Sequence, residues 1–330
     1  MLPLILFCAG FTWDAFSFRG QISPLSFYTL CAYFVLFHFC IPFWQEEPTK
    51  KWRKVITWLI PFTLGGLYSA LTVLYFRSSS LGWEIIVSGS LFVIYALHEF
   101  IFSKHKNISL TLSLQLPSCA LLLNFLIPHW LGSPSPQIWI YSAFGSLALH
   151  AVLLFLQIKN IHWKIWFLGP SLWIVLWGLY FQQKLPPVPL ILKDSFITSQ
   201  AKISKSNHFS GMVSEQSVID KILNRPQSIY WKNGQSVSAF FSVYAPERMK
   251  SSLVVSWWHQ EKDDWILYDQ IQYPQVLGGR EWGWRFYAIK RNVLKGTWRV
   301  ELRLKNGGVL GEEIFTLGST QVLEHPRSLK

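Results

Sequence analysis

Six long apolar stretches constrain what this chain can fold into. The hydrocarbon core of a bilayer is about 30 Å thick, and a helix needs roughly 20 mostly apolar residues to cross it. The sequence meets this requirement at residues 23–45, 55–76, 80–102, 108–131, 136–158 and 165–182. Short polar segments separate these stretches. We therefore predict that residues 1–183 form a multi-span transmembrane helical domain.

The first 18 residues leave the number of spans at six or seven. Met1–Thr12 is apolar, but Asp14 follows it, and the segment lacks the basic start of a secretory signal peptide. It could form a seventh span or a re-entrant segment, or it could result from a misassigned start site. We favour a seventh span, so the predicted fold class of this half is an all-α membrane bundle of 6–7 transmembrane helices.

Charged residues divide the chain into two unlike halves. Residues 1–183 contain 10 Lys and Arg and 5 Asp and Glu, whereas residues 184–330 contain 20 and 13. The whole chain is 51% hydrophobic and only 15% charged, against about 25% charged in typical soluble proteins. This composition excludes disordered, collagen-like and coiled-coil classes. It predicts a membrane domain followed by a water-soluble domain.

Basic residues in the short loops predict the orientation of the membrane domain. Lys and Arg are concentrated on the cytoplasmic side of membrane proteins. Alternate loops at residues 46–54, 103–107 and 159–164 together carry eight Lys and Arg, whereas the loops between them carry only Arg77. These three loops are therefore predicted to be cytoplasmic, and the chain after residue 183 is predicted to be extracytoplasmic. An added first span would move only the N-terminus.

The exported half is predicted to form a β-sandwich. A Pro-rich connector and polar lead-in cover residues 184–234, the sandwich core covers 235–318, and a tail covers 319–330. Thr297–Leu304 alternates apolar and polar residues, as in a half-buried strand, and Asn306-Gly307 favours a hairpin turn after it. The expected strands are Val237–Val243, Ser252–Trp258, Trp265–Ile271, Trp284–Ile289, Thr297–Leu304 and Val309–Phe315. Short strands between turn signals are typical of an antiparallel sandwich.

A set of motifs in this half carries a family resemblance. They are Pro186–Leu190 after the last span, Gly278–Arg285, Lys290–Val293, Gly296–Val300, and Gly311 with Phe315. Taken together they resemble the bacterial domain-of-unknown-function family 2914 over roughly residues 184–318. The resemblance implies the architecture of a multi-span region followed by this domain. It implies no activity or substrate.

Ionisable residues inside the predicted spans form the first candidate site. Such residues are costly in a bilayer and often functional. His38, His98, Glu99 and His150 lie in three predicted helices at similar depths. Three imidazoles could bind a metal or haem or relay protons. Alternatively, His98 and Glu99 have no functional role, and their side chains extend to the nearby membrane–water interface.

Aromatic and cationic residues of the exported half form the second candidate site. Planar cationic groups beside aromatic faces suit sugars, peptidoglycan strands or anionic lipid headgroups. The candidate ligand-binding residues are Arg280, Trp282, Trp284, Arg285, Arg291 and Trp258. Alternatively, the loop glycines of Gly278–Trp284 only make tight turns. Trp298 is predicted to be core, and at most one of the adjacent Trp257 and Trp258 can be.

The sequence contains few motifs typical of enzymes, so we expect a binding role rather than catalysis. The sequence has no nucleotide-binding glycine loop, zinc spacing or Gly-x-Ser-x-Gly elbow. No catalytic residue or cofactor is predicted, and the spread of basic residues argues against a nucleic-acid partner. We expect the protein to lie in the bacterial inner membrane. Its expected partners are the bilayer and an envelope glycan, lipid or protein. The alternative is a membrane transporter or a redox or metal protein that uses the intramembrane His and Glu residues.

Overall fold

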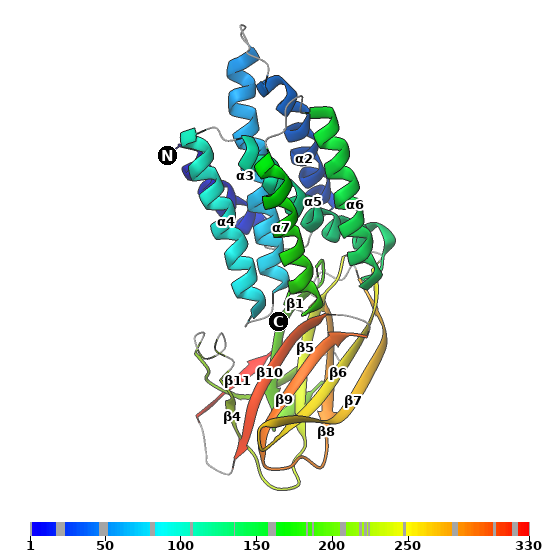
Figure 1. The fold of residues 1–330 in the computed structure, drawn as a ribbon. Helices are drawn as coiled ribbons and strands as arrows, with labels where there is room; N and C mark the ends of the chain where they lie inside the picture. Colours follow the sequence, from blue (N-terminus) through cyan, green and yellow to red (C-terminus); the bar gives the residue numbers. More distant parts are fainter. Residues whose placement is uncertain are drawn as a thin grey trace. The chain divides into compact units, whose positions relative to one another are not determined.

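The computed structural model divides the chain into two compact units (Figure 1). One is helical and made mainly of residues before Pro186, and the other is strand-rich and formed mainly by Pro186–Lys330. The structure describes all residues except 1, 18–23, 46–51, 80–82, 106–107, 135, 158–162, 183, 187, 205–208, 218–219, 221–222, 224, 247–248, 279–282, 306–307, 319–322 and 330.

The described part of the N-terminal half forms seven helices, close to the predicted apolar stretches. They are α1 (Leu2–Ser17), α2 (Pro24–Gln45), α3 (Trp52–Ser78), α4 (Trp83–His105), α5 (Ile108–Leu131), α6 (Pro136–Gln157) and α7 (Trp163–Phe181). Three of these helices contain a stretch long and apolar enough to cross a membrane: Glu84–Ile101, Leu110–Leu131 and Gln137–Phe155. Phe27–Cys40 and Phe167–Phe181 are shorter apolar helical stretches.

Helix α5 is the most buried of the three long apolar helices and packs against both α6 and α7. It contains Pro117 and Pro128 and remains helical through both. Neighbouring helices can satisfy the backbone groups that a proline leaves without an intrahelical bond. Helix α1 is tied to α3, because the Ser69 hydroxyl donates a hydrogen bond to the Asp14 carboxylate.

The described residues of the C-terminal half form strands that assemble into three sheets. They are β1 (Ile191–Thr198), β2 (Ala201–Ile203), β3 (Phe209–Ser214), β4 (Gln227–Tyr230), β5 (Val237–Tyr244), β6 (Lys250–Glu261), β7 (Asp264–Leu277), β8 (Trp284–Lys290), β9 (Gly296–Leu304), β10 (Val309–Gly318) and β11 (Glu324–Ser328). The sheet orders are β1-β5-β8, β4-β10-β9-β6-β7 and β11-β3-β2. Among the described pairings only that of β4 with β10 is parallel.

Strand β5 is buried along its whole length because both of its faces are covered. Residues such as Phe241 on one face share a core cluster with Trp257 of β6 and Val300 of β9, which belong to the five-stranded sheet. On its other face, Phe240 packs with Phe209 of β3 in a smaller cluster. A strand covered on both faces reads as a nearly continuous apolar run, which explains the sequence from Val237 to Tyr244.

The alternation predicted for Thr297–Leu304 is present in β9. Trp298, Val300 and Leu302 are fully buried in the core. Glu301 points to the opposite face as expected, but it is also buried, because Trp258 lies over it and donates an indole N–H to its carboxylate at 3.1 Å. The antiparallel pairing of β9 with β10 fits the predicted hairpin. Its turn residues, Asn306 and Gly307, lie outside the described residues.

The segments predicted as lead-in and tail contain strands that their sequences did not indicate. Residues 184–234 contribute β1 to β4, and the tail contributes β11, which pairs with β3. These strands are short or carry polar residues, so they show little period-two alternation. Strand β2 pairs with its neighbour β3, but the other pairings, of β1 with β5, β4 with β10 and β3 with β11, join segments far apart in sequence. Such distant pairing leaves no local signal.

Two edge strands of different sheets are joined by an ion pair. The Lys290 ammonium of β8 donates a hydrogen bond to the Asp269 carboxylate of β7 at 2.8 Å. This bond lowers the pKa of Asp269 below its usual value. Close by, the Tyr273 hydroxyl of β7 donates to the Tyr287 carbonyl of β8 at 2.5 Å, and burial raises the pKa of Tyr273 to about 12. The β7 and β8 edges are therefore fixed to each other.

Candidate functional site

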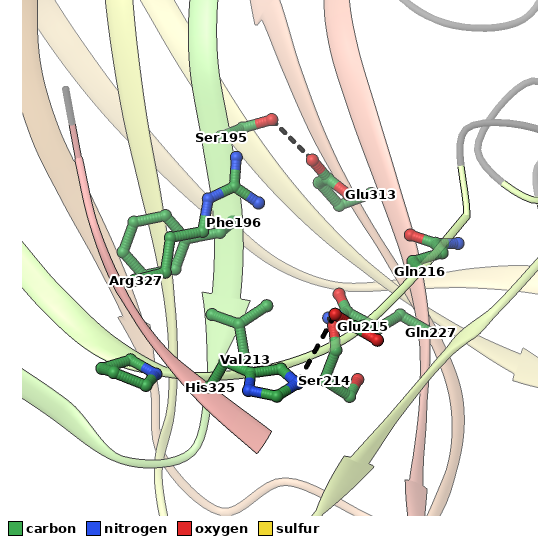
Figure 2. A pocket seen from close by; sticks show the side chains of 11 residues that line it. Ser195, Phe196, Val213, Ser214, Glu215, Gln216, Gln227, Glu313, His325 and Arg327 are labelled. Carbon is green, nitrogen blue, oxygen red and sulfur yellow. Dashed lines mark hydrogen bonds and ion pairs between the residues drawn. The ribbon is translucent and has the colours of Figure 1, made fainter. Parts of the chain in front are cut away.

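A polar cavity of about 310 Å³ lies within the strand-rich unit, lined by residues of β1, β3, β4, β10 and β11. Figure 2 shows Glu313, Gln216 and Gln227 on one side of it and Arg327 and Phe196 on the other. Most of the lining side chains carry hydrogen-bonding groups. We refer to this cavity as the β11 pocket.

Arg327 of β11 is held in position on one wall of the β11 pocket. Its guanidinium donates a hydrogen bond to the Asp194 carboxylate at 2.5 Å. The same group lies over the Phe196 ring, 5.4 Å from the ring centroid. An arginine that is paired with a carboxylate and packed on an aromatic face has its planar donors fixed in direction.

Two glutamates line the β11 pocket, each with a different partner. The Ser195 hydroxyl of β1 donates to Glu313 Oε1 of β10 at 2.5 Å. Glu215 follows β3, and its carboxylate lies 3.6 Å from His325 Nε2 of β11. Figure 2 marks both interactions. Glu215 and His325 are well exposed, so they form the rim of the pocket.

Polar side chains of the lining, two of them buried, are held by hydrogen bonds to the backbone. The Gln227 amide, only 7% exposed, donates to the Ser214 carbonyl at 2.9 Å. The Ser214 hydroxyl donates to the Ser228 carbonyl at 2.6 Å. Gln216 donates to the Arg225 carbonyl at 2.7 Å. These bonds fix the orientation of the lining side chains.

None of the residues that line the β11 pocket was selected from the sequence. Ser195 and Glu313 are separated by 118 positions and meet only because β1 and β10 fold together. His325 and Arg327 come from the segment that was expected to be a tail. The only local signal is the row of charged and amide residues within short strands, which is common on solvent-exposed faces.

The structure does not gather the predicted ligand-binding residues into one site. Trp258 lies on β6 of the five-stranded sheet, whereas Trp284 and Arg285 begin β8 of another sheet. Arg291 follows the far end of β8 and is exposed. Two more of these candidates, Arg280 and Trp282, lie outside the described residues.

Trp284 and Trp258 have structural contacts of their own. Trp284 packs against the main core, and its indole N–H donates to the Leu277 carbonyl. Trp258 lies on the face of its sheet opposite the buried Trp257, as the alternation predicted. Arg299 lies between two indole rings, 5.2 Å from the Trp258 centroid and 4.9 Å from that of Trp265. This stack stiffens the outer face of the sheet.

Three of the candidates that were predicted to lie within the membrane, His38, His98 and Glu99, form two groups beside α5. His98 and Glu99 of α4 are each 1% exposed, and their side chains approach to 3.5 Å. His98 Nε2 also lies 2.9 Å from the Thr111 hydroxyl of α5. One turn further along α5, Gln115 lies within hydrogen-bond distance of His38 Nε2 of α2, at 2.5 Å. These contacts link α2, α4 and α5 inside the helical unit.

His150 of α6 is buried as well. Among the residues that the structure describes, no group of three or more His, Cys, Asp or Glu side chains could hold a metal ion. Hydrogen bonds such as those of Thr111 and Gln115 are typical contacts between transmembrane helices. His38 and His98 therefore join α2 and α4 to α5.

Part of the strand-rich unit matches a known protein family. Residues 250–317, from the start of β6 almost to the end of β10, match a family described as "Protein of unknown function (DUF2914)". The match confirms the resemblance inferred from the motifs. No curated protein matches the chain.

Two solved structures are similar at low identity. An immunoglobulin-like protein from Pseudomonas aeruginosa has 14% identity and a TM-score of 0.23, and the match covers 40% of this chain and 98% of that one. The Pseudomonas fluorescens alkylpurine DNA glycosylase AlkC, bound to DNA containing an abasic site analogue, has 11% identity and a TM-score of 0.22, with 88% and 97% covered. TM-scores this low do not establish a shared fold.

Proposed function

We propose that this chain is an integral protein of the bacterial inner membrane that presents an extracytoplasmic β-sandwich, and that the sandwich binds a component of the envelope. The helical unit would cross the bilayer 6–7 times. The bound component would be a glycan, a lipid or a protein. The β11 pocket is the observation that carries the binding role, because it is a preformed polar cavity in the predicted exported half.

The distribution of polarity in the helical unit supports its insertion in a membrane. Large apolar side chains are exposed on its surface, including Phe155, which is 87% exposed, and Phe144, Ile174 and Val175. Polar side chains are buried instead, as His98 and Glu99 illustrate. A soluble protein rarely exposes so much apolar surface, whereas lipid-facing helices require it.

The arrangement of the helices supports the predicted orientation. Helices α2 to α7 run alternately in opposite directions, so the C-terminal ends of α2, α4 and α6 lie at one end of the helical unit (Figure 1). The basic loops at residues 46–54, 103–107 and 159–164 follow these three ends. The positive-inside rule then assigns that end to the cytoplasm.

The core of the strand-rich unit supports a sandwich. Residues of the β1-β5-β8 sheet and of the five-stranded sheet contribute to a single apolar cluster. Two sheets that enclose one core in this way are the defining feature of a β-sandwich. The ion pair between Asp269 and Lys290 closes one edge.

A retention experiment tests the binding role. The full chain is reconstituted in phosphatidylcholine nanodiscs that carry an affinity tag. The nanodiscs are incubated separately with purified sacculi, envelope lipid and a periplasmic protein extract. We expect one of these fractions to be retained by loaded nanodiscs and not by empty ones. Retention of none of the three would contradict the proposed function.

A second candidate function, a transporter or a redox or metal protein, rests on the buried His98 and Glu99. Ionisable side chains placed within transmembrane helices are a default functional hypothesis. A haem spectrum or stoichiometric metal in the purified full chain would favour this function over the first.

A further inference from the structure

We propose that the β11 pocket binds the pyranose ring of a saccharide through its hydroxyl groups. This inference deepens the proposed function, because it names the class of envelope component that the exported domain recognises. It rests on the composition of the pocket lining, on the size of the cavity and on the fixed geometry of the lining side chains.

The lining offers the mixture of groups that vicinal hydroxyls require. Each hydroxyl of a sugar both donates and accepts hydrogen bonds. Glu215 and Glu313 supply carboxylates that accept, Arg327 supplies a guanidinium that donates, and Gln216 and Gln227 supply amides that do both. Carboxylates and guanidinium groups are planar and can bind two neighbouring groups of a ligand at once.

The charges in the pocket argue against a phosphate or another anionic ligand. Arg327 is the arginine of the lining, and its guanidinium is already bound by the Asp194 carboxylate. Two glutamate carboxylates line the same cavity and would repel a second negative charge. A hydroxyl-bearing neutral ring meets no such repulsion.

The polarity of the lining argues against a purely apolar ligand. Eight of the eleven lining residues have polar side chains, and an apolar ligand would displace water from them without replacing its hydrogen bonds, which costs free energy. A cavity of about 310 Å³ lies at the lower end of the roughly 300–1,000 Å³ range of small-molecule sites. The pocket therefore fits one or two sugar rings rather than a lipid chain.

The position of the lining groups matches entry of a ligand from one side. Glu215 and His325 are exposed at the rim, with 86% and 54% of their side chains accessible. Ser214 and Gln227 are buried and define the inner end. A sugar ring would therefore pass the rim and place hydroxyls on Glu313 and Gln227, while Arg327 remains held by Asp194.

Saturation-transfer NMR on the full chain in phosphatidylcholine nanodiscs tests the proposal. Detergents with sugar headgroups are avoided during purification because they would compete. The probes are glucose and N-acetylglucosamine, compared with cyclohexanol, which lacks vicinal hydroxyls, and with ethanolamine, which carries an amine. We expect transfer to at least one sugar and to neither comparison compound. Transfer to ethanolamine or cyclohexanol alone, or to none of the four, would overturn the proposal.

Charge-removing variants locate the binding. Glu313→Gln and Glu215→Gln keep the shape of the side chain but replace a charge-assisted hydrogen bond by a weaker one, so we expect about a tenfold loss of sugar affinity for the first and a smaller loss for the second. Glu215 is exposed, so its variant tests the pocket even if Glu313→Gln fails to fold. The matched control is Glu261→Gln, because Glu261 is exposed and bonded to Tyr268 on the β6–β7 hairpin.

The outcomes separate this inference from the proposed function. Sugar affinities that are unchanged in both pocket variants would overturn the pocket as the saccharide site. If sugars fail to bind while an envelope lipid or protein is retained by loaded nanodiscs, the inference falls and the proposed function stands. If no envelope fraction is retained and no sugar binds, both fall.

Discussion

Replacing Trp298 by alanine is expected to destabilise the strand-rich unit by about 3–5 kcal/mol, the usual cost of removing a large aromatic side chain from a core. Trp298 is fully buried in the cluster shared by two sheets. Its indole N–H also donates to the Leu294 carbonyl at 2.9 Å, and its ring lies 4.7 Å from that of His259. The substitution removes packing and a hydrogen bond together.

Amide hydrogen exchange of the full chain measures this loss. Protection over β5 and β9 reports the opening of the strand-rich unit without requiring two-state unfolding of the whole protein. The control is Trp265→Ala, since Trp265 is half-buried and lies on Arg299 at the outer face. We expect the control to lose less than about 1.5 kcal/mol. Equal losses would contradict the assignment of Trp298 to the core.

Replacing Gly278 by alanine is expected to have a comparable effect for a steric reason. A Cβ atom at Gly278 would lie 1.7 Å from the Pro246 carbonyl oxygen, so the backbone itself would have to move. Its amide also donates to the Met249 carbonyl at 2.8 Å. Forcing an atom into a filled space costs about 1–3 kcal/mol and more when backbone must shift, so we expect at least about 3 kcal/mol.

The matched control for this change is Gly318→Ala. Gly318 lies at the end of β10, and a Cβ atom there would meet nothing within 4 Å. Hydrogen exchange over β6 and β7 should therefore change by less than about 0.5 kcal/mol in the control. A Gly278 variant as stable as the control would contradict the steric conflict with the Pro246 carbonyl.

The strands of the main core could be predicted because their signals are local. The run from Val237 to Tyr244 and the alternation around Trp298 both depend on which faces are covered, and burial confirms each. Strands β6 and β7 extend beyond their predicted ends. Their outer parts carry polar residues such as Gln260 and Gln272, which pairing accommodates but which a hydrophobic pattern does not reveal.

The β11 pocket could not be predicted because its residues are distant in sequence. Ser195, Glu313 and Arg327 belong to three different sheets and meet through packing between the sheets, which no local pattern specifies. The aromatic candidates illustrate what residue type alone leaves open. Trp258 and Trp284 were reasonable ligand contacts by residue type, yet Trp258 lies over Glu301 and Trp284 packs against the core. Residue type alone does not tell which aromatic side chains make structural contacts or which polar side chains line a cavity.

The positions of the helices along the sequence were predicted, but the polar contacts between the helices were not. The apolar stretches lie close to the observed helices. By contrast, the spacing of Thr111 and Gln115 on α5 became meaningful only when His98 and His38 were found beside them. Side-chain pairs between helices depend on helix rotation, which packing sets rather than composition.

The most direct test of the central claim is a pair of reporter fusions after Lys330, made in bacterial cells. One fusion carries alkaline phosphatase, which is active only outside the cytoplasm. The other carries green fluorescent protein, which fluoresces only when the C-terminus lies in the cytoplasm. The proposed topology predicts an active phosphatase and a dark fluorescent protein. An inactive phosphatase with a bright fluorescent protein would place the β11 pocket in the cytoplasm and contradict the account.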